Sequence, residues 1–490
     1  MPTAKSTVKA HITSRDLRIL SHTLFLTMRR QVHMLNRGLR AWKQRRMTRG
    51  VLAAGTVGIA VGALLTGCGS GENEASSAAA NEALTSILSN FTPAPGDEVP
   101  NVDVKFAMWP YGDTTIGFIG IEKGWFKEAG INLEPAQGQT QLDSQTSANL
   151  VSGALDTTLD FLPTRVNKYE QQPSIKSFGV TNMFIGNYVL ASPSSGLKPL
   201  SDFLVDGADF NAAVSSVVDE IQPERIALSD QPAPHNLLNA LLSIADKTTG
   251  DLKNVQVLED TKIVNLAKGG GTDVAMVSGA AQAIQLLNMG FTPIFAFQDL
   301  ADNLPAGDDR VAAGVGHVSL AATSSYIGEN LDTVLRFQSV YWRIIDYIQT
   351  KPEEALAVSL PHLNQATGFN LSLEESMRIF RDFYQMVGFG DSAKFYDDPT
   401  YPLGLGPVYE AQIATAKGHG VIKGDVSPTD FVVGGQVYHI MNELKTKYDQ
   451  AVSISTASDE VKTKAQAYYD AFNFLDAYRT LSAASPTAQQ

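Results

Sequence analysis

The pattern of apolar and polar positions up to residue 162 alternates between short apolar runs and amphipathic stretches. Val104–Met108 is mostly apolar and leads into the turn-forming run Trp109-Pro110-Tyr111-Gly112-Asp113. Apolar runs bounded by turn residues predict strands, and apolar residues three or four positions apart predict helices. Strands separated by helices in turn predict βαβ units and a mainly parallel sheet. We expect strands at Val104–Met108, Ile131–Pro135 and Thr157–Leu162, and helices at Thr115–Lys123 and Leu142–Ser152.

A second region of the chain repeats this order of elements. In both regions a helix ends at a glycine, and an aspartate then precedes an apolar strand, as at Gly153 and Asp156. The repeated order predicts two related α/β lobes. The second region predicts strands at Arg225–Leu228, Val255–Leu258 and Val274–Val277, a helix at Pro234–Lys247 and a short helix ending at Lys268.

Beyond Asp299 the pattern is mostly helical. Several stretches begin with a Ser or Thr near an acidic residue, or with Pro at the first helical position, and both are start signals of helices. We expect these helices to pack against the lobes and support them. They are Leu331–Thr350, Pro352–Leu360, Ser372–Val387, Pro407–Lys417, Ser427–Tyr448 and Thr456–Ser482.

An uncharged run, residues 51–65, follows a basic lead and ends in Leu65-Thr66-Gly67-Cys68, which holds the only cysteine. A basic region, an apolar stretch and small residues before a cut form the pattern of an export signal. The stretch is short for a membrane-spanning helix. The tetrapeptide resembles the bacterial lipobox, which implies that Cys68 is lipidated and becomes the new N-terminus. The alternative is an incidental or buried free cysteine.

The basic lead leaves two further questions open. It is longer than an export signal requires, so Met1, Met28, Met34 and Met47 are all possible starts. Its Arg45-Arg46 pair is compatible with a twin-arginine signal and equally with an ordinary basic region.

Charge and composition change sharply after the lead. Residues 1–50 hold 12 Lys or Arg and one acid, so the chain beyond them holds 26 basic and 50 acidic residues, a net charge of −24. Such an acidic body repels nucleic acid. From Gly69 to about Asn101 the chain is rich in Ser, Ala, Gly, Asn and Pro, which predicts a flexible tether, with a helical turn or two as an alternative in the Ala-rich part Ala78–Asn90.

Motifs within residues 104–163 resemble one family. They are Phe106-Ala107-Met108-Trp109-Pro110, the run EKGWFKEAGI at 122–131, and Gly153-Ala154-Leu155-Asp156. The family comprises the periplasmic substrate-binding proteins of ABC importers for sulfonates, nitrate and thiamine-precursor pyrimidines. The resemblance covers about residues 103–350. It implies an α/β fold of the periplasmic-binding-protein type II kind, with two lobes, a hinge and a helical C-terminal part.

Candidate ligand contacts in the first lobe are the residues that leave its strands. Ligands of open α/β sheets bind beyond the carboxyl ends of the strands, and aromatic walls with a few polar groups line most small-molecule sites. The candidates are Trp109, Tyr111, Asp113, Thr114, Phe161, Leu162 and Thr164, with Asn182 near the crossing into the second lobe.

In the second lobe the turn Ser229–His235 starts a helix, whose free backbone N–H groups favour an anionic or acceptor group. Ser278 and Gly279 end the next strand, where many relatives carry Trp-Glu-Pro, and this departure leaves the ligand class open. His235 has the alternative of packing as an ordinary helix residue. The candidates of this lobe are Asp230, Gln231, His235, Ser278 and Gly279.

These patterns divide the chain into consecutive parts. We expect a basic lead with a lipoprotein signal at 1–67, the lipidated Cys68 with a tether at 68–101, and the first part of lobe one at 102–192. Lobe two is expected at 193–295, a return to lobe one with the C-terminal helices at 296–482, and a tail at 483–490.

The function implied by the resemblance is capture of a small organic solute between two lobes, for an ABC permease and its ATPase. The protein is then exported, lipid-anchored outside the membrane, monomeric and not an enzyme. Lacking a cysteine other than Cys68, it cannot act as the catalytic-cysteine relatives do. We expect no cofactor, and the histidines are too scattered to predict a metal site. The alternative is an exported enzyme or sensor on the same fold.

The solute class stays open between two kinds. Trp109, Tyr111 and Phe161 with Asp113 would suit a flat, partly cationic heterocycle such as an aminopyrimidine. A sulfonate or nitrate would need a well-placed cation. The basic residues near the predicted cleft are Arg165 and Lys168.

Overall fold

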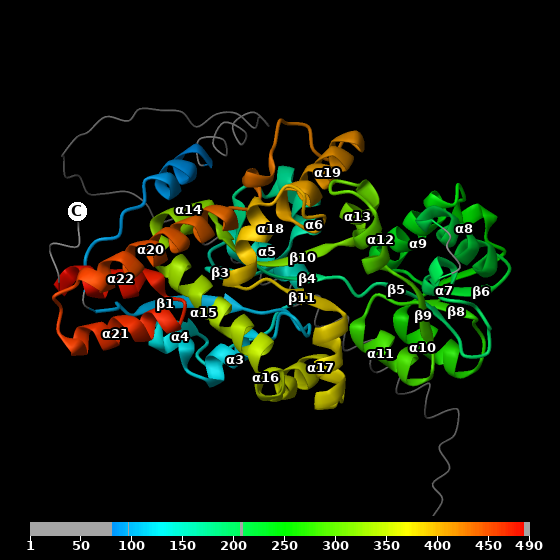
Figure 1. Ribbon diagram of the computed structural model, residues 1–490, viewed down its shortest axis with the longest axis horizontal. Coiled ribbons are helices and arrows are strands. Elements are labelled where there is room, and N and C mark those ends of the chain that lie inside the picture. The colour runs from blue at the N-terminus through cyan, green and yellow to red at the C-terminus, as the bar shows by residue number, and fades with distance from the viewer. Residues whose placement is uncertain (1–80, 97, 206–208, 485–490) are drawn as a thin grey trace, which may run out of the picture. The chain divides into compact units, whose positions relative to one another are not determined.

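The computed structural model describes residues 81–96, 98–205 and 209–484 (Figure 1). Cys68, the basic lead and most of the predicted tether lie outside these residues. No helix within the described ranges is both long and apolar enough to cross a membrane. Two β-sheets organise the described chain, one in each lobe.

The sheet of lobe one has the strand order β11-β4-β10-β3-β1-β2. Strand β1 runs parallel to β2 and β3, as predicted, but β10 is antiparallel to both of its neighbours, β3 and β4. The prediction of a mainly parallel sheet was therefore wrong at its centre, because β10 enters only after the chain returns from lobe two. The strands are β1 (Val102–Ala107), β2 (Ile131–Glu134), β3 (Thr157–Phe161), β4 (Ile175–Phe184), β10 (Gly316–Thr323) and β11 (Tyr384–Met386).

The sheet of lobe two has the order β7-β6-β8-β5-β9. Strand β6 is parallel to β7 and β8, and β5 is antiparallel to β8 and β9. The predicted class of two α/β lobes with a helical C-terminal part is confirmed by these two sheets and the helices around them. The strands of lobe two are β5 (Tyr188–Ala191), β6 (Arg225–Ser229), β7 (Asn254–Leu258), β8 (Val274–Met276) and β9 (Thr292–Ala296).

The chain enters and leaves lobe two side by side (Figure 1). Residues 185–187 connect β4 of lobe one to β5 of lobe two, so lobe two begins at Tyr188, ahead of the predicted boundary at 193. Tyr188 pairs with Ala296, the last residue of β9. The return to β10 passes through helices α12 (Phe297–Asn303) and α13 (Asp309–Gly314).

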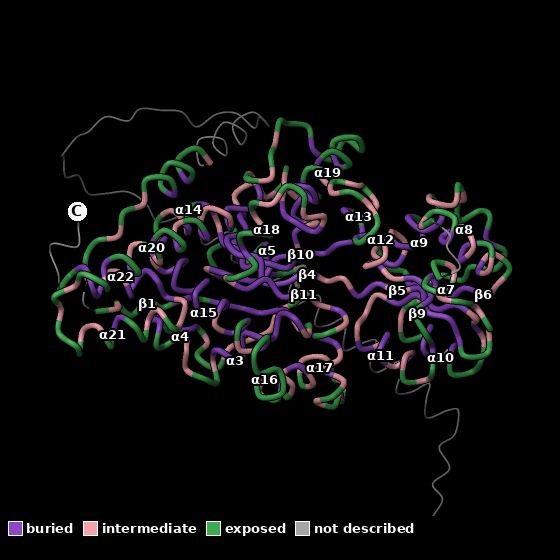
Figure 2. Tube along the Cα trace, in the orientation of Figure 1, coloured by how far each residue is buried: buried purple, intermediate pink, exposed green. Residues whose placement is uncertain are grey.

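Helices cover both sheets, and their outward faces are exposed while the strands of lobe one are buried (Figure 2). Lobe two holds α7 (Leu200–Val205), α8 (Phe210–Ile221), α9 (Pro232–Ile244), η2 (Thr249–Asp251), α10 (Asp260–Lys268) and α11 (Ala280–Asn288). The first helices of lobe one are α3 (Gly117–Glu122), α4 (Trp125–Glu128), α5 (Asp143–Val151), α6 (Leu162–Lys168) and η1 (Tyr169–Gln171).

The helices after β10 all follow the return from lobe two. Predicted helices Ser372–Val387 and Thr456–Ser482 are each interrupted, the first by strand β11 and the second by a break between α21 and α22. These helices are α14 (Ser324–Glu329), α15 (Leu331–Thr350), α16 (Pro352–Thr367), α17 (Leu373–Asp382), α18 (Phe389–Asp397), α19 (Leu405–Gly418), η3 (Pro428–Asp430), α20 (Gly434–Ile454), α21 (Asp459–Asp470) and α22 (Phe474–Ala484).

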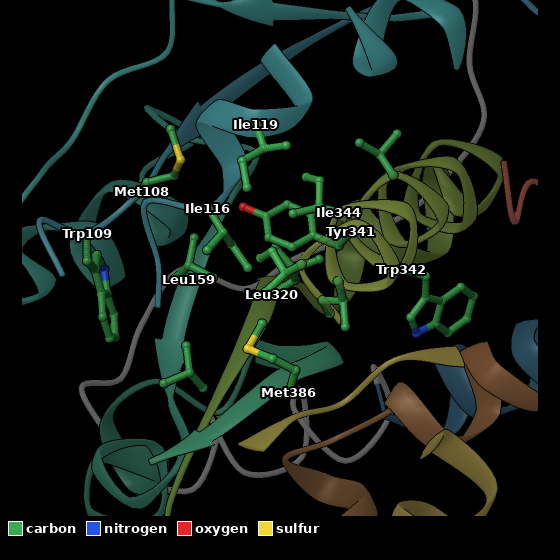
Figure 3. Packing of buried hydrophobic residues seen from close by; sticks show 14 of the residues in the cluster. Met108, Trp109, Ile116, Ile119, Leu159, Leu320, Tyr341, Trp342, Ile344 and Met386 are labelled. Carbon is green, nitrogen blue, oxygen red and sulfur yellow. The ribbon is translucent and has the colours of Figure 1, made fainter. Parts of the chain in front are cut away.

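Helix α15 forms the centre of the lobe-one core. Its Phe337 meets Phe106 of β1 edge to face, with ring centroids 5.0 Å apart. Figure 3 shows Tyr341 and Ile344 of the same helix next to Ile116 and Ile119. The contact is close, because a Cβ atom added to Gly117 would lie 2.7 Å from the Tyr341 hydroxyl. Packing of this density accounts for the nearly complete burial of α15.

The EKGWFKEAGI run behaves as its glycines predict. Gly124 and Gly130 have φ angles of 74° and 71°, in the left-handed region that favours glycine. Phe126 between them is buried in the core. Trp125 is partly buried, with the Arg343 guanidinium stacked 4.3 Å from its ring.

The end of the predicted tether is part of the folded body. Residues 81–89 form a helix whose Leu84 and Leu88 are buried, four positions apart on one face. Asn81 Nδ2 donates to Asp430 Oδ1 at 3.1 Å. The helix agrees with the helical alternative for Ala78–Asn90, while the flexible tether predicted up to residue 101 ends before this helix.

Candidate functional site

The candidate residues of lobe one gather at one edge of its sheet. Strands β1, β3 and β4 all end at this edge, while β10 and β11 begin there. Across the sheet Phe161 pairs with Val318, and Val318 with Asn182. Asn182 in turn pairs with Met386 of β11. The strand register therefore brings together residues that are more than 200 positions apart.

The loop after β1 is held by its own hydrogen bonds. Thr114 Oγ1 donates to the Trp109 carbonyl at 2.7 Å, and Trp109 Nε1 donates to Thr146 Oγ1 at 3.1 Å. The rings of Trp109 and Tyr111 meet edge to face with centroids 6.3 Å apart. Trp109 and Thr114 are buried, whereas Tyr111 is 48% exposed. Trp109 thus positions Tyr111, and most of the surface that a solute could touch belongs to the tyrosine.

Asp113 is a buried acid at the centre of this edge. Burial raises its pKa from 3.8 to about 6, while hydrogen bonds from its own backbone N–H and from the Asn182 and Tyr384 side chains oppose the rise. The pKa of the Tyr384 phenol lies well above 10, first through burial and then through the adjacent Asp113 carboxylate. The carboxyl group of Asp113 therefore changes charge near neutral pH.

Tyr384 was not among the sequence candidates. It lies in β11, a three-residue strand inside a segment whose pattern predicts a helix. Asn182, its neighbour at Asp113, is fully buried, and its Nδ2 donates to Thr181 Oγ1 at 3.1 Å. The Asn182 Oδ1 atom has no hydrogen-bond partner among the described residues. A buried acceptor without a partner therefore lies beneath this edge.

The segment after β3 carries a buried ion pair. Arg165 donates to both carboxylate oxygens of Asp160, at 2.8 and 2.9 Å, and also to Ser147 Oγ and Gln172 Oε1. Leu162 is buried beside it, while Phe161 and Thr164 are half-buried. Because the Asp160 carboxylate compensates the charge of Arg165 and accepts its hydrogen bonds, this guanidinium is a poor partner for an anionic solute.

In lobe two the edge has the same construction. Strands β6, β7 and β8 are parallel, so they all end where Asp230, Gln231, Ser278 and Gly279 lie. The candidates Asp230 and Gln231 are exposed, and His235 is half-buried on α9. Helix α9 begins at Pro232, two residues earlier than predicted.

Backbone donors at this edge of lobe two are depleted in two places, the predicted start of α9 and the turn at Ser278 and Gly279. Pro232 and Pro234 stand in the first turn of α9 and have no N–H, so few free donors remain there. The N–H groups of Ser278 and Gly279 both donate to Asp260 Oδ2, at 3.1 and 2.8 Å. The start of α9, where an anion site was expected, therefore has few N–H donors. The N–H groups at Ser278 and Gly279 are already bonded to Asp260, a contact that the sequence pattern did not reveal.

Residues 185–187, where the chain crosses from lobe one to lobe two, connect the two sheet edges that carry the candidate residues. Three residues, 185–187, lead from the carboxyl end of β4 to the start of β5, which lies at the carboxyl end of β8. Four Cα steps span at most about 14 Å. The candidate groups of the two lobes are thus joined by a short segment. Asn187 in this segment donates to the Gly314 carbonyl at 3.4 Å.

A second direct link between the lobes lies on α11 and α17. Asn288 Nδ2 donates to Glu375 Oε1 at 3.1 Å, and its Oδ1 accepts from Arg378 Nη1 at 3.4 Å. Glu375 is itself held by the capping box at the start of α17. The Tyr188 hydroxyl also donates to the Asp382 carbonyl, at 2.6 Å.

A separate pocket of about 320 Å³ lies away from both edges, between α4, α15 and α21. Its walls include Trp125, Val340, Arg343 and Tyr468. Arg343 is paired there with Glu128 at 2.5 Å. Among the described residues, no cluster of three or more His, Cys, Asp or Glu side chains could hold a metal ion.

Comparisons with known proteins give structural neighbours only. No family model matches the chain, and no curated protein matches it. The chain is similar to the periplasmic aliphatic sulphonate-binding protein of Escherichia coli, at 12% identity and a TM-score of 0.44, over 66% of this chain and 94% of that one. It is also similar to the periplasmic nitrate-binding protein of Synechocystis, at 13% identity and a TM-score of 0.43, over 73% and 91%.

A third neighbour is the alkanesulfonate-binding protein of Xanthomonas axonopodis bound to MOPS, at 12% identity and a TM-score of 0.42, over 68% and 99%. Sulfonate-binding and nitrate-binding proteins are thus among the solved structures similar to this chain, the same group that the motifs of residues 104–163 resemble.

Proposed function

We propose that this chain is the extracytoplasmic solute-binding component of an ABC importer. It captures a small organic solute between its two lobes and delivers it to a permease that works with an ATPase. The observation that carries the proposal is the crossing at residues 185–187, which joins the carboxyl edges of two α/β sheets. Ligands of such sheets bind at those edges. The lipobox resemblance supports anchoring at Cys68 on the outer side of the membrane.

The ligand contacts that we propose lie on both edges. In lobe one the exposed Tyr111 and the half-buried Phe161 and Thr164 contact the solute, supported from below by the buried members of the set. The supporting residues are Trp109, Asp113, Thr114, Leu162 and Asn182. In lobe two the contacts come from Asp230, Gln231, His235, Ser278 and Gly279.

The charges at the lobe-one edge favour an aminopyrimidine-like solute over a sulfonate or nitrate. Arg165 is already paired with Asp160, so it contributes little to the binding of an anion. Asp113 and the unpaired Asn182 Oδ1 instead accept hydrogen bonds. A flat heterocycle with N–H donors would stack on Tyr111, and the buried Asp113 and Asn182 beneath it favour a donor-bearing solute over an anion.

Binding would act through the balance between open and closed lobes. A solute that contacts both edges stabilises the closed arrangement by its differential affinity, and the closed arrangement is what a permease recognises. The Asn288 contacts with Glu375 and Arg378 give the lobes a second point at which closure can be held.

Isothermal titration calorimetry on the full-length protein tests the proposal. The panel contains aminopyrimidines, alkanesulfonates and nitrate, and we expect saturable binding of an aminopyrimidine. Tyr111→Ala should weaken binding about tenfold or more, because a stacking surface is lost. Val151→Ala, which removes an exposed apolar side chain of α5, serves as the control. A folded protein that binds no member of a broad solute panel would contradict the proposal that this chain is a solute receptor.

A further inference from the structure

Strand β7 has no strand partner on its outer side within the described part of the chain. It is the terminal strand in the sheet order and pairs with β6 on one side. Four of its five residues are exposed, including Val255 at 36% and Val257 at 52%. An edge strand with exposed apolar side chains is a template for pairing with another strand.

The backbone of β7 is oriented for such pairing. The Leu258 carbonyl accepts from the Asp230 N–H, so the backbone groups of Leu258 face β6. In a parallel pair, alternate residues turn their backbone groups to the same neighbour. Gln256 therefore also faces β6, whereas Val255 and Val257 direct their N–H and C=O groups outward.

The sequence around β7 is complementary to itself in the antiparallel direction. A two-fold axis through Gln256 places Val255 of one copy opposite Val257 of the other. These are the outward-facing residues, so each valine can donate to and accept from its opposite residue, as a hydrogen-bonded antiparallel pair does. The side chains of the two valines also lie on one face, which gives an apolar cross-strand contact.

The same axis pairs opposite charges at both ends of the strand. Lys253 of one copy lies opposite Glu259 of the other, and symmetry repeats the pair. Both side chains are exposed. Glu259 is 3.2 Å from Lys262 within its own chain, but this pair is exposed on both sides and therefore weak.

We propose that two copies of this chain form a two-fold symmetric dimer through antiparallel pairing of β7. The two lobe-two sheets then join into one continuous sheet, with Val255–Val257 pairs at its centre and Lys253–Glu259 pairs at its ends. The dimer departs from the monomer expected from the sequence. Because its interface is one short strand per copy, it forms at high protein concentration and weakens as salt screens the terminal pairs.

Charge reversal tests both the partner and the register. Lys253→Glu sets glutamate opposite glutamate twice, and Glu259→Lys sets lysine opposite lysine twice. Each variant should raise the dimer dissociation constant about tenfold or more in sedimentation equilibrium, because like charges directly opposite one another destabilise a strand pair. The double variant Lys253→Glu with Glu259→Lys restores opposite charges and should return the constant to near that of the parent.

Lys268→Glu is the matched control, since it makes the same charge change on the same lobe at an exposed position outside β7. It should leave dimerisation unchanged. Circular dichroism of every variant separates loss of pairing from loss of folding. A parent that stays monomeric at millimolar concentration and low salt would overturn the proposal, and so would a double variant no better than the single ones.

Discussion

At the scale of single residues, Asp113 couples the candidate site to proton concentration. Its pKa is about 6 in the folded chain, against 3.8 for an ordinary aspartate, because burial disfavours the charged form. The folded state therefore binds more protons than the unfolded state between these two values. The contribution of Asp113 to the free energy of unfolding is complete below pH 4 and is lost as the pH rises through 6.

We predict that Asp113→Asn flattens this part of the stability profile. One pKa unit corresponds to about 1.4 kcal/mol, so the parent should lose about 3 kcal/mol of unfolding free energy between pH 4 and 7 through this group. Urea unfolding at a series of pH values measures the difference between parent and variant. Asp230→Asn, on an exposed side chain of lobe two, should keep the profile of the parent.

His317 has the opposite dependence on pH. Burial lowers its pKa from 6.5 to about 4, while a hydrogen bond between its Nε2 and the Leu403 carbonyl, 3.0 Å long, acts against burial. The unfolded state binds the extra proton, so stability is present above pH 6.5 and is lost as the pH falls through 4.

Replacing His317 by Gln should remove this acid sensitivity. We expect the parent to lose up to about 3 kcal/mol more than the variant between pH 6.5 and 4. The variant starts from a lower stability, because its side chain fills less space between Phe395 and Tyr409. The test is therefore the slope of the urea midpoint against pH, and equal slopes would contradict the assignment.

At the scale of elements, sequence patterns located β1, β2, β3, β6, β7 and β8 and missed β4, β5, β9, β10 and β11. The residues of β4 mix Lys176, Ser177 and Asn182 with apolar ones, although nearly all are buried. Lys176 is accommodated because its Nζ donates to the Asp430 carbonyl, far away in the sequence. A local pattern cannot reveal a polar residue that is satisfied by a distant partner.

The site shows the same limit. The pattern found residues that leave strands, such as Tyr111 and Asp113, because strand ends are visible locally. It missed Asp160, Asp260 and Tyr384, whose roles depend on which residues they meet. Asp160 pairs with the Arg165 guanidinium, and Asp260 accepts hydrogen bonds from two backbone N–H groups. Both contacts exist only in the folded chain.

A buried ion pair joins α15 and α22. Arg336 donates to both carboxylate oxygens of Asp476, at 2.8 and 2.9 Å, and both side chains are almost fully buried. Asp476→Asn removes the negative charge and leaves the guanidinium uncompensated. We predict a loss of about 3–5 kcal/mol in unfolding free energy.

Chemical unfolding monitored by circular dichroism measures this loss. The control is Asp382→Asn, which breaks the more exposed pairs with Arg381 and Arg378 and should cost about 1 kcal/mol or less. Equal effects of the two substitutions would contradict the assigned role of the buried pair.

At the scale of the whole molecule, one apolar cluster extends from lobe one into lobe two. It contains Leu162, Val180 and Met183 from lobe one together with Val189 and Leu228 from lobe two. Unfolding of either lobe alone would expose the part of the cluster that belongs to the other. The two lobes are therefore coupled in stability even though each has its own sheet.

We predict that the body unfolds in a single cooperative transition. Differential scanning calorimetry should give one peak, with calorimetric and van't Hoff enthalpies that agree. Met183→Ala, in the shared cluster, should lower the temperature of that peak without splitting it. Two separate transitions in the parent would mean that the cluster does not couple the lobes.

The position of β10 also determines the order in which the protein can fold during synthesis. β10 lies between β3 and β4, yet the ribosome makes it after all of lobe two. Until then the two strands that flank it have no partner between them, and their hydrogen-bonding edges stay open. The sheet of lobe two is complete on emergence, whereas the sheet of lobe one must wait for β10, which makes the unfinished lobe one the species most in need of chaperone protection.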